Sequence, residues 1–317
     1  MLIVHAHEHE HEHEHDYEDE DEAPYHRSVH SRVRERERER VRKHGWRLSA
    51  LPVLGPPVIR PALLLRCAPP MTEPVEKVVT TRLTIRNIET DATSTVSPGW
   101  ISRILEHMRW SVFGLDTFVL RDRIFGGVAR AGVFEYHEPL RVNDEVEIAT
   151  WLARVGNTSY DFGHTVKRLD DGAVALRGRV TVVHLGPDGP APVGADLASA
   201  VLDEPLPARA VWPEVERRSS WTRQWIVRPS DQDSFRHVNQ ARYVDYIDDT
   251  RQLASMAGEA AGLEGPLASL SVEYLRETHA GQLVQMETWV TASGTRAFEL
   301  TCPDTGEVHS RGQAGTG

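Results

Sequence analysis

The chain has 317 residues, of which 40% are hydrophobic and 26% charged, a composition typical of folded proteins with one or two domains. Its two cysteines, Cys67 and Cys302, exclude a framework of several disulfides and a site built from several thiolates. The formal net charge of −11 opposes a phosphate backbone, so we expect no nucleic-acid partner.

Residues 1–70 differ in composition from the rest of the chain. His5–His15 alternates His with Glu, and Arg32–Lys43 alternates Arg with Glu. Such segments bury too little apolar surface to offset chain entropy, so we predict a disordered or non-native tail, with Met71 as an alternative start. Imidazoles and carboxylates are metal-ligand types, but this pattern lacks the rigid outer contacts that fix a metal site, and we expect no metal.

The tail also bears on location. Residues 48–70 are apolar, but six prolines and two arginines interrupt them, so no membrane span is predicted. The acidic residues near the start exclude a secretory signal and a transit peptide. Because two cysteines also fit a reducing compartment, we expect a cytoplasmic protein.

From about residue 80 onward the sequence repeats itself. Three residues recur with the same spacing, since Arg86, Asp91 and Arg109 correspond to Arg228, Asp233 and Arg251. Later matches keep this order, with Phe134–Tyr136 matching Val272–Tyr274 and Thr150–Trp151 matching Thr288–Trp289. An ordered series of this kind indicates an internal duplication. We predict a first unit at 71–190, a proline-rich linker at 191–217 and a second unit at 218–317.

The first unit is predicted to hold a short strand, one helix and several further strands. Apolar residues at helical spacing predict the helix, namely Ile101, Ile104, Leu105, Met108 and Val112. Three strand-like runs follow, at Val146–Leu152, Thr158–Val166 and Val174–Leu185.

The second unit has the same order of elements. Asn239 is a suitable amino-terminal cap for a helix with a buried stripe of Tyr243, Ile247, Thr250 and Ala254. Strands are predicted at Leu267–Tyr274, Leu283–Val290 and Ala297–Thr301. The chain then ends in Gln-Ala-Gly-Thr-Gly, so we expect a poor or truncated last strand. The two units predict an α+β fold, each with a curved antiparallel sheet around one helix, and the sheets paired edge to edge or face to face.

The candidate chemistry lies between Ser230 and Arg251. Asp233, His237 and a helix start follow one another closely, which gathers a base, a proton carrier and unpaired N–H groups at one place. This combination suits attack on a carbonyl group. In isolation the same residues also fit a turn, a cap and a structural histidine.

The pattern DxDxxxHVNxxxYxxYxxxxR resembles the signature of hotdog-fold thioesterases, and the duplication resembles a double-hotdog acyl-ACP or acyl-CoA thioesterase. The resemblance covers most of residues 78–317. Plant-type acyl-ACP thioesterases carry Asp, Asn and His in one run, and Glu and Cys in a later run. Asp233 and His237 match the first run, and Glu277, within Val272–Thr278, matches the second.

The chain departs from the plant-type pattern at three positions, where Asn, a second Asn and Cys are replaced by Phe235, Gln240 and Thr278. Thr278 excludes a cysteine nucleophile at that position. The first unit keeps Asp91 but has Thr95 and Pro139 at the positions of the histidine and the glutamate. We therefore expect one active site, built mainly from the second unit and supported by the first.

The resemblance also implies a mechanism. Glu277 or Asp233 would activate water or attack the carbonyl directly, and His237 would orient or carry a proton. Backbone N–H groups near Val238 and Asn239 would stabilise the oxyanion. Substrate contacts are assigned to Phe235, Arg236 and Tyr243, of which Tyr243 also fits the core. No cofactor is implied.

We therefore expect hydrolysis of a fatty acyl thioester carried by acyl carrier protein (ACP) or CoA. One alternative is a noncatalytic sensor or scaffold that binds acyl thioesters, which Phe235 and Thr278 favour. Another is a hydratase or dehydratase of the hotdog fold, a class that also uses Asp and His. Because the two units can pair with each other, either a monomeric pseudo-dimer or a homo-oligomer is expected.

Overall fold

The structure is a computed structural model that describes residues 78–112, 127–186, 188–210, 212, 218–259, 265–292 and 294–317. The predicted disordered tail and Met71 lie outside these residues. No helix among the described residues is long and apolar enough to cross a membrane.

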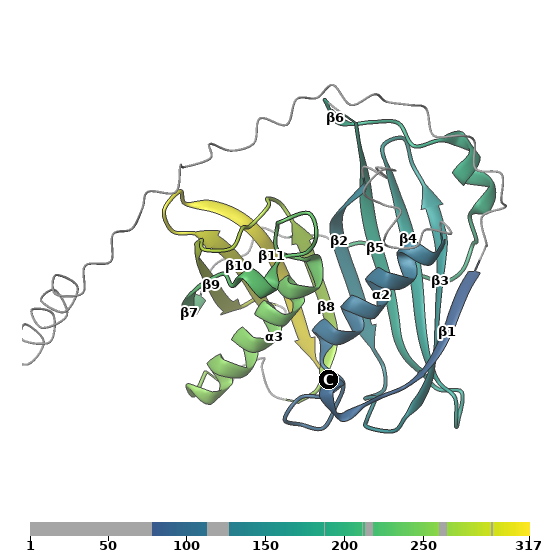
Figure 1. The fold of residues 1–317 in the computed structure, drawn as a ribbon. Coiled ribbons are helices and arrows are strands. Elements are labelled where there is room, and N and C mark those ends of the chain that lie inside the picture. The colour runs from purple at the N-terminus through teal and green to yellow at the C-terminus, as the bar shows by residue number, and fades with distance from the viewer. Residues whose placement is uncertain are drawn as a thin grey trace, which may run out of the picture. The chain divides into compact units, whose positions relative to one another are not determined.

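One antiparallel sheet of eleven strands runs through both units (Figure 1). The first unit supplies β1 (Val78–Thr84), β2 (Gly127–Tyr136), β3 (Glu145–Val155), β4 (Ser159–Arg168), β5 (Val174–Gly186) and the short β6 (Gly189–Pro190). The second supplies β7 (Arg218–Ile226), β8 (Leu267–Tyr274), β9 (Leu283–Val290), β10 (Arg296–Cys302) and β11 (Glu307–Thr316). The strand order is β1-β3-β4-β5-β2-β8-β11-β10-β9-β7, with β6 paired to β5.

The two units join edge to edge through β2 and β8. Gly132 pairs with Val272 and Phe134 with Leu270, so the matching segments of the repeat lie against each other in antiparallel register. This pairing covers the edge strand that each unit exposes alone. The duplicated α+β hotdog architecture is thus confirmed, and the pairing left open by the sequence is edge to edge.

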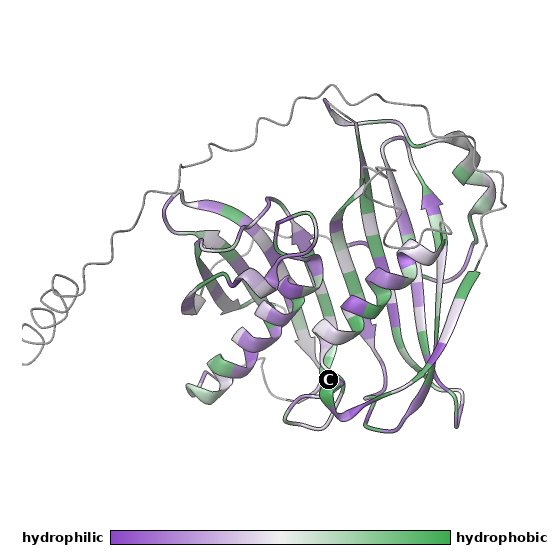
Figure 2. Cartoon of the chain, in the orientation of Figure 1, coloured by the Kyte–Doolittle hydropathy of each residue, from purple (hydrophilic) through white to green (hydrophobic). Residues whose placement is uncertain are grey.

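Each unit holds one long helix on the same face of the sheet, α2 (Pro98–Val112) in the first and α3 (Gln240–Met256) in the second (Figure 1). Hydrophobic and hydrophilic residues alternate along the strands, because successive side chains point to opposite faces (Figure 2). Leu105 of α2 and Val244 of α3 are fully buried beneath the helices. Burial of these stripes fixes both helices to the sheet.

The last strand corrects the sequence expectation. Instead of being poor or truncated, β11 is a ten-residue strand, paired with both β10 and β8. Its glycines weaken strand propensity, but Gly312 lies directly under α3. A Cβ atom there would lie 2.8 Å from the Ile247 side chain. The glycine therefore allows the close packing of helix on strand.

The loops before the two helices repeat in backbone detail. A short 3-10 turn stands in each, η1 (Asn87–Glu89) and η4 (Pro229–Asp231), and its buried carboxylate accepts from the backbone N–H of the preceding arginine. Ser94 and Arg236 occupy the same place in the repeat and have φ of 60° and 67°. Left-handed backbone at equivalent non-glycine residues shows that both loops keep one conformation.

The helices α2 and α3 lie side by side and antiparallel (Figure 1). Near the amino terminus of α2, Arg103 forms an ion pair with Asp245, and a Cβ at Gly99 would overlap the same carboxylate. Further along α2, Glu106 accepts from the side chain of Asn239, which lies at the start of α3. The contact at Gly99 lets the two helices approach closely.

The described part of the predicted linker packs on the first unit. It includes η3 (Ala195–Ala200), where Leu197 and Ala200 are buried. The Leu202 N–H donates to the Leu152 carbonyl at 2.9 Å, and Arg209 pairs with the fully buried Asp161 at 2.8 Å. These contacts hold the linker against the sheet of the first unit.

Candidate active site

The loop before α3 holds Asp233 in a compact turn. Asp233 Oδ1 accepts from the Phe235 N–H at 2.8 Å, and the Asp233 N–H donates to the His237 carbonyl at 3.0 Å. Arg236, at positive φ, completes the reversal. One carboxylate oxygen is thus committed to the turn, as the structural interpretation predicted, while the other remains for a second partner.

That second oxygen faces His237. Asp233 Oδ2 lies 3.5 Å from His237 Nδ1, and the two side chains are 20% and 26% exposed. His237 Nδ1 also lies 3.3 Å from the Val238 carbonyl. The Phe235 ring stacks on the imidazole with centroids 5.9 Å apart, although Phe235 itself is 61% exposed. The structure therefore brings Asp233, Phe235 and His237 together beside the start of α3.

The predicted oxyanion donors need correction. The Val238 N–H donates to the Thr278 carbonyl at 2.7 Å, and the Asn239 N–H donates to the Asp231 carbonyl at 3.0 Å. Neither N–H is available to a substrate oxygen. Gln240 is the first residue of α3, and its N–H has no acceptor among the described residues. The first free donor at the positive end of the helix is therefore one position later.

Asn239 has a role that the sequence did predict and one that it did not. Its side-chain Oδ1 caps α3 by accepting from the Ala241 N–H at 2.9 Å. Its amide nitrogen donates to both oxygens of Glu106, at 3.1 and 2.9 Å. Glu106 had no signal in the sequence beyond its place in the repeat. The first unit thus fixes the helix start of the second through this residue.

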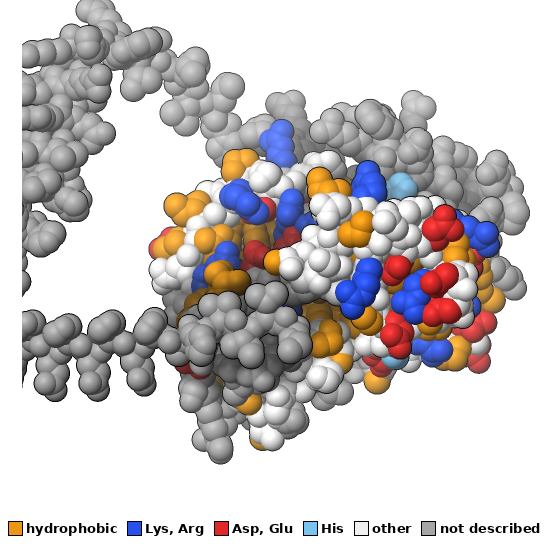
Figure 3. Space-filling view, turned by 90° about the horizontal axis from the view of Figure 1, so that it is seen from below, with side chains coloured by type: hydrophobic (Ala, Val, Ile, Leu, Met, Phe, Trp, Pro, Cys, Tyr) orange, Lys and Arg blue, Asp and Glu red, His pale blue; other side chains and the backbone are white. Residues whose placement is uncertain are grey.

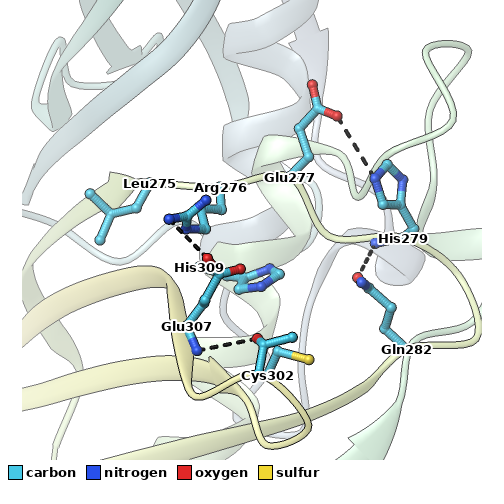
Figure 4. A pocket seen from close by; sticks show the side chains of 9 residues that line it. Leu275, Arg276, Glu277, His279, Gln282, Cys302, Glu307 and His309 are labelled. Carbon is cyan, nitrogen blue, oxygen red and sulfur yellow. Dashed lines mark hydrogen bonds and ion pairs between the residues drawn. The ribbon is translucent and has the colours of Figure 1, made fainter.

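The segment after β8 reaches the same loop. Its backbone is tied there by the bond from Val238 to Thr278, and the His279 ring lies 3.0 Å from the Arg236 carbonyl. The Glu277 side chain is 67% exposed and lies 3.8 Å from His279 Nε2. Among the described residues Glu277 contacts neither Asp233 nor His237. The strand end approaches the helix tip, but the carboxylate is directed toward His279 (Figure 4).

A buried chain of polar groups lies behind this segment. The Tyr243 hydroxyl donates to Thr278 Oγ1 at 2.9 Å, and Thr278 Oγ1 lies 2.8 Å from His309 Nδ1. Thr278 is fully buried, and Tyr243 and His309 are each 4% exposed. Burial raises the pKa of Tyr243 to about 12 and lowers the pKa of His309. Tyr243 is therefore a core residue with an engaged hydroxyl.

A shallow cleft of about 450 Å³ opens on the other side of His309. It lies between the segment after β8 and the turn that joins β10 to β11 (Figure 4). Arg276 and Glu307 form an ion pair of 2.9 Å at this cleft, and the thiol of the buried Cys302 lines it. No group of three or more His, Cys, Asp and Glu side chains in the described parts of the chain could hold a metal ion.

Models of two related families match the two halves. Residues 94–175 match the thioesterase superfamily, and residues 227–313 match the thioesterase-like superfamily. No curated protein matches the chain in sequence.

Solved structures share the double architecture. An acyl-ACP thioesterase from Bacteroides thetaiotaomicron is 18% identical with a TM-score of 0.64, over 75% of this chain and 97% of that one. A putative oleoyl thioesterase from Lactobacillus plantarum is 20% identical with a TM-score of 0.63, over 75% and 96%. The 12:0-ACP thioesterase from Umbellularia californica is 15% identical with a TM-score of 0.61, over 75% and 96%. At these identities the likeness concerns the fold. Taken with the family matches in both halves, it identifies the chain as a double-hotdog member of the thioesterase superfamily.

Proposed function

We propose that this chain hydrolyses a fatty acyl thioester carried by ACP or CoA and releases the free acid and the thiol. Membership of the thioesterase superfamily in both halves supports thioester hydrolysis in general. The observation that carries the proposal is the juxtaposition of Asp233 and His237 with the free N–H of Gln240. Base, proton carrier and oxyanion donor then stand at one helix terminus.

The chemistry follows from this arrangement. The thioester carbonyl oxygen accepts from the Gln240 N–H, where the helix dipole favours the charge that develops on it. Asp233 Oδ2, with His237 beside it, takes a proton from water, whose oxygen bonds to the carbonyl carbon. The carbon–sulfur bond then breaks and the electron pair leaves on sulfur as thiolate, which the proton held by His237 or Asp233 neutralises. Glu277 is the second carboxylate able to act on water after a rotation of its exposed side chain.

Arg236 is the best candidate for a residue that binds the phosphate groups of the carrier. Both ACP and CoA present phosphate groups near the thiol arm, so a cation at the mouth of the site is expected to help binding. Arg236 is exposed and forms no ion pair with the described residues, whereas Arg228 and Arg242 pair with the buried Asp231. On the face of the molecule seen from below, basic and acidic side chains lie close together over one part of the surface (Figure 3).

The proposal is tested with panels of acyl-CoA and acyl-ACP thioesters of increasing chain length. We expect turnover of at least one chain length, and a loss of roughly 100-fold or more in kcat for Asp233→Asn and for His237→Ala, as is usual for general acid–base groups. Asp91→Asn is the matched control, because Asp91 accepts from the Thr93 N–H at 2.8 Å in the same turn of the first unit. Absence of turnover with every thioester, using folded protein, contradicts the proposal.

A noncatalytic acyl-thioester binder is the second candidate. The backbone N–H groups of Val238 and Asn239 and the hydroxyl of Thr278 all form internal hydrogen bonds. This favours a binder, because the family resemblance places catalytic groups at these positions. Tight binding of acyl-CoA in calorimetry, without release of free thiol, distinguishes this function from hydrolysis.

A further inference from the structure

Glu106 in α2 contacts the residue that caps α3. Its two carboxylate oxygens accept from the side-chain nitrogen of Asn239 at 3.1 and 2.9 Å, across the boundary between the two units. One helical turn earlier in α2, Arg103 forms an ion pair with Asp245 of α3. Because residues three apart lie on the same side of a helix, α2 holds the first two turns of α3 through two neighbouring side chains.

The contact decides which way the Asn239 amide faces. An ionised carboxylate accepts hydrogen bonds and donates none, so Glu106 can bond only to the amide nitrogen. The amide oxygen must then face the helix, where it accepts from the Ala241 N–H at 2.9 Å. With the amide reversed, its nitrogen would meet the Ala241 N–H and its oxygen would meet the carboxylate, and neither contact is a hydrogen bond.

Asn239 in turn determines which donor of α3 stays open. Its backbone carbonyl accepts from the Arg242 N–H at 2.9 Å, and its side-chain oxygen accepts from the Ala241 N–H. One residue therefore engages two of the first three N–H groups of the helix. The third is the N–H of Gln240, which has no acceptor among the described residues and is the donor that the proposed function assigns to the thioester carbonyl.

The cap is fixed from the loop as well. The Asn239 N–H donates to the Asp231 carbonyl at 3.0 Å. The Asp231 carboxylate is itself held by Arg228 and by the Tyr246 hydroxyl, each at 2.9 Å. Loop, helix and first unit thus each supply a partner to Asn239, and Glu106 is the partner that keeps its side chain from rotating.

The two units treat their helix caps differently. Ser97, the cap of α2, has the same contact with its loop, since its N–H donates to the Glu89 carbonyl at 3.0 Å. The residue of α3 at the place of Glu106 is Asp248, which pairs with Arg251 of its own helix at 2.9 Å. The contact with the loop is therefore common to both caps, whereas Glu106 adds a contact from the opposite helix at the cap that adjoins the candidate active site.

We propose that Glu106 is a positioning residue for thioester hydrolysis, which acts through Asn239 to keep the Gln240 N–H open and directed at the thioester carbonyl. A donor stabilises an oxyanion best when it is already held where the negative charge develops, because no reorientation is then needed during the reaction. The first unit thereby takes part in catalysis. The inference rests on the proposed function and assigns a role in it to a residue outside the catalytic unit.

The test measures steady-state kinetics with the thioester that the wild-type chain hydrolyses fastest. In Glu106→Ala we expect kcat and kcat/KM to fall equally, by roughly tenfold or more, because the lost contribution is made in the transition state. Glu106→Gln keeps an acceptor for the Asn239 amide without the charge, so it should retain most of the wild-type kcat. Asp248→Ala is the matched control in α3 and should keep the wild-type kcat, whatever its stability.

A double-mutant cycle shows whether Glu106 acts through Asn239. We expect the double variant of Glu106→Ala and Asn239→Ala to be no slower than the slower single variant. Effects that multiply in the double variant overturn the inference. An equal loss of kcat in Glu106→Gln and Glu106→Ala also overturns it, because the charge would then act directly. A wild-type kcat in Glu106→Ala, even with a lowered melting temperature, shows a purely structural role and overturns it too.

Hydrogen exchange followed by NMR separates this inference from the proposed function. The Ala241 N–H should exchange faster in Glu106→Ala than in the wild type, by roughly fivefold or more, because its acceptor is no longer held. Unchanged exchange overturns the inference, whether or not any thioester is hydrolysed. Absence of turnover in the wild type, with the faster exchange in the variant, contradicts only the proposed function. If Glu106→Ala does not fold, Glu106→Leu replaces it in each comparison.

Discussion

Thr278 connects three parts of the candidate site through its hydroxyl and its backbone carbonyl. Its hydroxyl joins Tyr243 to His309, and its carbonyl holds the N–H of Val238. Replacement of the hydroxyl by a methyl group in Thr278→Val removes the hydrogen bonds to Tyr243 and His309. We expect a loss of about 1–3 kcal/mol in the free energy of unfolding, measured by urea denaturation.

Thr278→Ser is the control, because it keeps the hydroxyl and removes only a methyl group. It should stay much closer to wild type than Thr278→Val. Equal stability of the valine and serine variants would show that the hydrogen-bond chain contributes nothing.

The residues of the site differ in how far the sequence could predict them. Asp233 and His237 lie four positions apart in one loop, so their proximity follows from local structure. Glu106 and His309 meet Asn239 and Thr278 from 133 and 31 positions away, and only the folded sheet brings them there. The engagement of the Val238 and Asn239 N–H groups could not be predicted, because their backbone acceptors at Thr278 and Asp231 leave no pattern in the sequence.

At the level of the elements, the packing of α3 on β11 depends on one glycine. A Cβ at Gly312 would lie 2.8 Å from both the Ile247 side chain and the Ser271 carbonyl oxygen. We expect Gly312→Val to force α3 away from the sheet and to cost about 1–3 kcal/mol, as overpacking of a core does. Thermal unfolding followed by circular dichroism measures the effect.

Gln313→Val is the neighbouring control, since its side chain points to the other face of β11. A smaller loss of stability is expected there. If both variants unfold at the same temperature, the close approach at Gly312 is not what limits the packing. The sequence alone suggested a poor strand here because glycine has a low strand propensity, while the demand for a small residue comes from a helix 65 positions earlier in the chain.

At the level of the whole molecule, two buried histidines make stability depend on pH. Burial lowers the pKa of His164 well below the usual histidine value of 6.5 and also lowers the pKa of His309. Below about pH 6.5 the unfolded chain therefore binds protons that the native chain does not, so stability is retained above that pH and falls as the pH drops further. We expect the melting temperature to fall between pH 7 and pH 5.

The variant His164→Phe removes the larger of the two contributions to the pH dependence of stability. It places in the first unit the side chain that the second unit has at that position. Its melting temperature should depend less steeply on pH over the same interval. An unchanged pH dependence would mean that His164 accepts a proton in the native state.

The overall architecture could be predicted because a duplication is visible in the spacing of matched residues, which does not depend on helix or strand propensity. Matched residues such as Asp91 and Asp233 keep their spacing, and the strands at Leu267–Tyr274 and Leu283–Val290 fall where the alternating pattern predicted them. The choice between edge-to-edge and face-to-face pairing remained open, since the repeat and the strand patterns specify the elements of each unit but not how the units pair. Only the register of β2 against β8 decides it.

Arg103 and Asp245 occupy the same place in the two copies, and they meet each other where the helices cross. In an ancestor with two identical halves, the same residue would have stood on both helices at this crossing, and two like charges repel each other. Opposite charges are possible only once the halves have become different from each other. The charges at this crossing therefore disfavour pairing of either half with a second copy of itself and favour pairing of the two different halves within one chain.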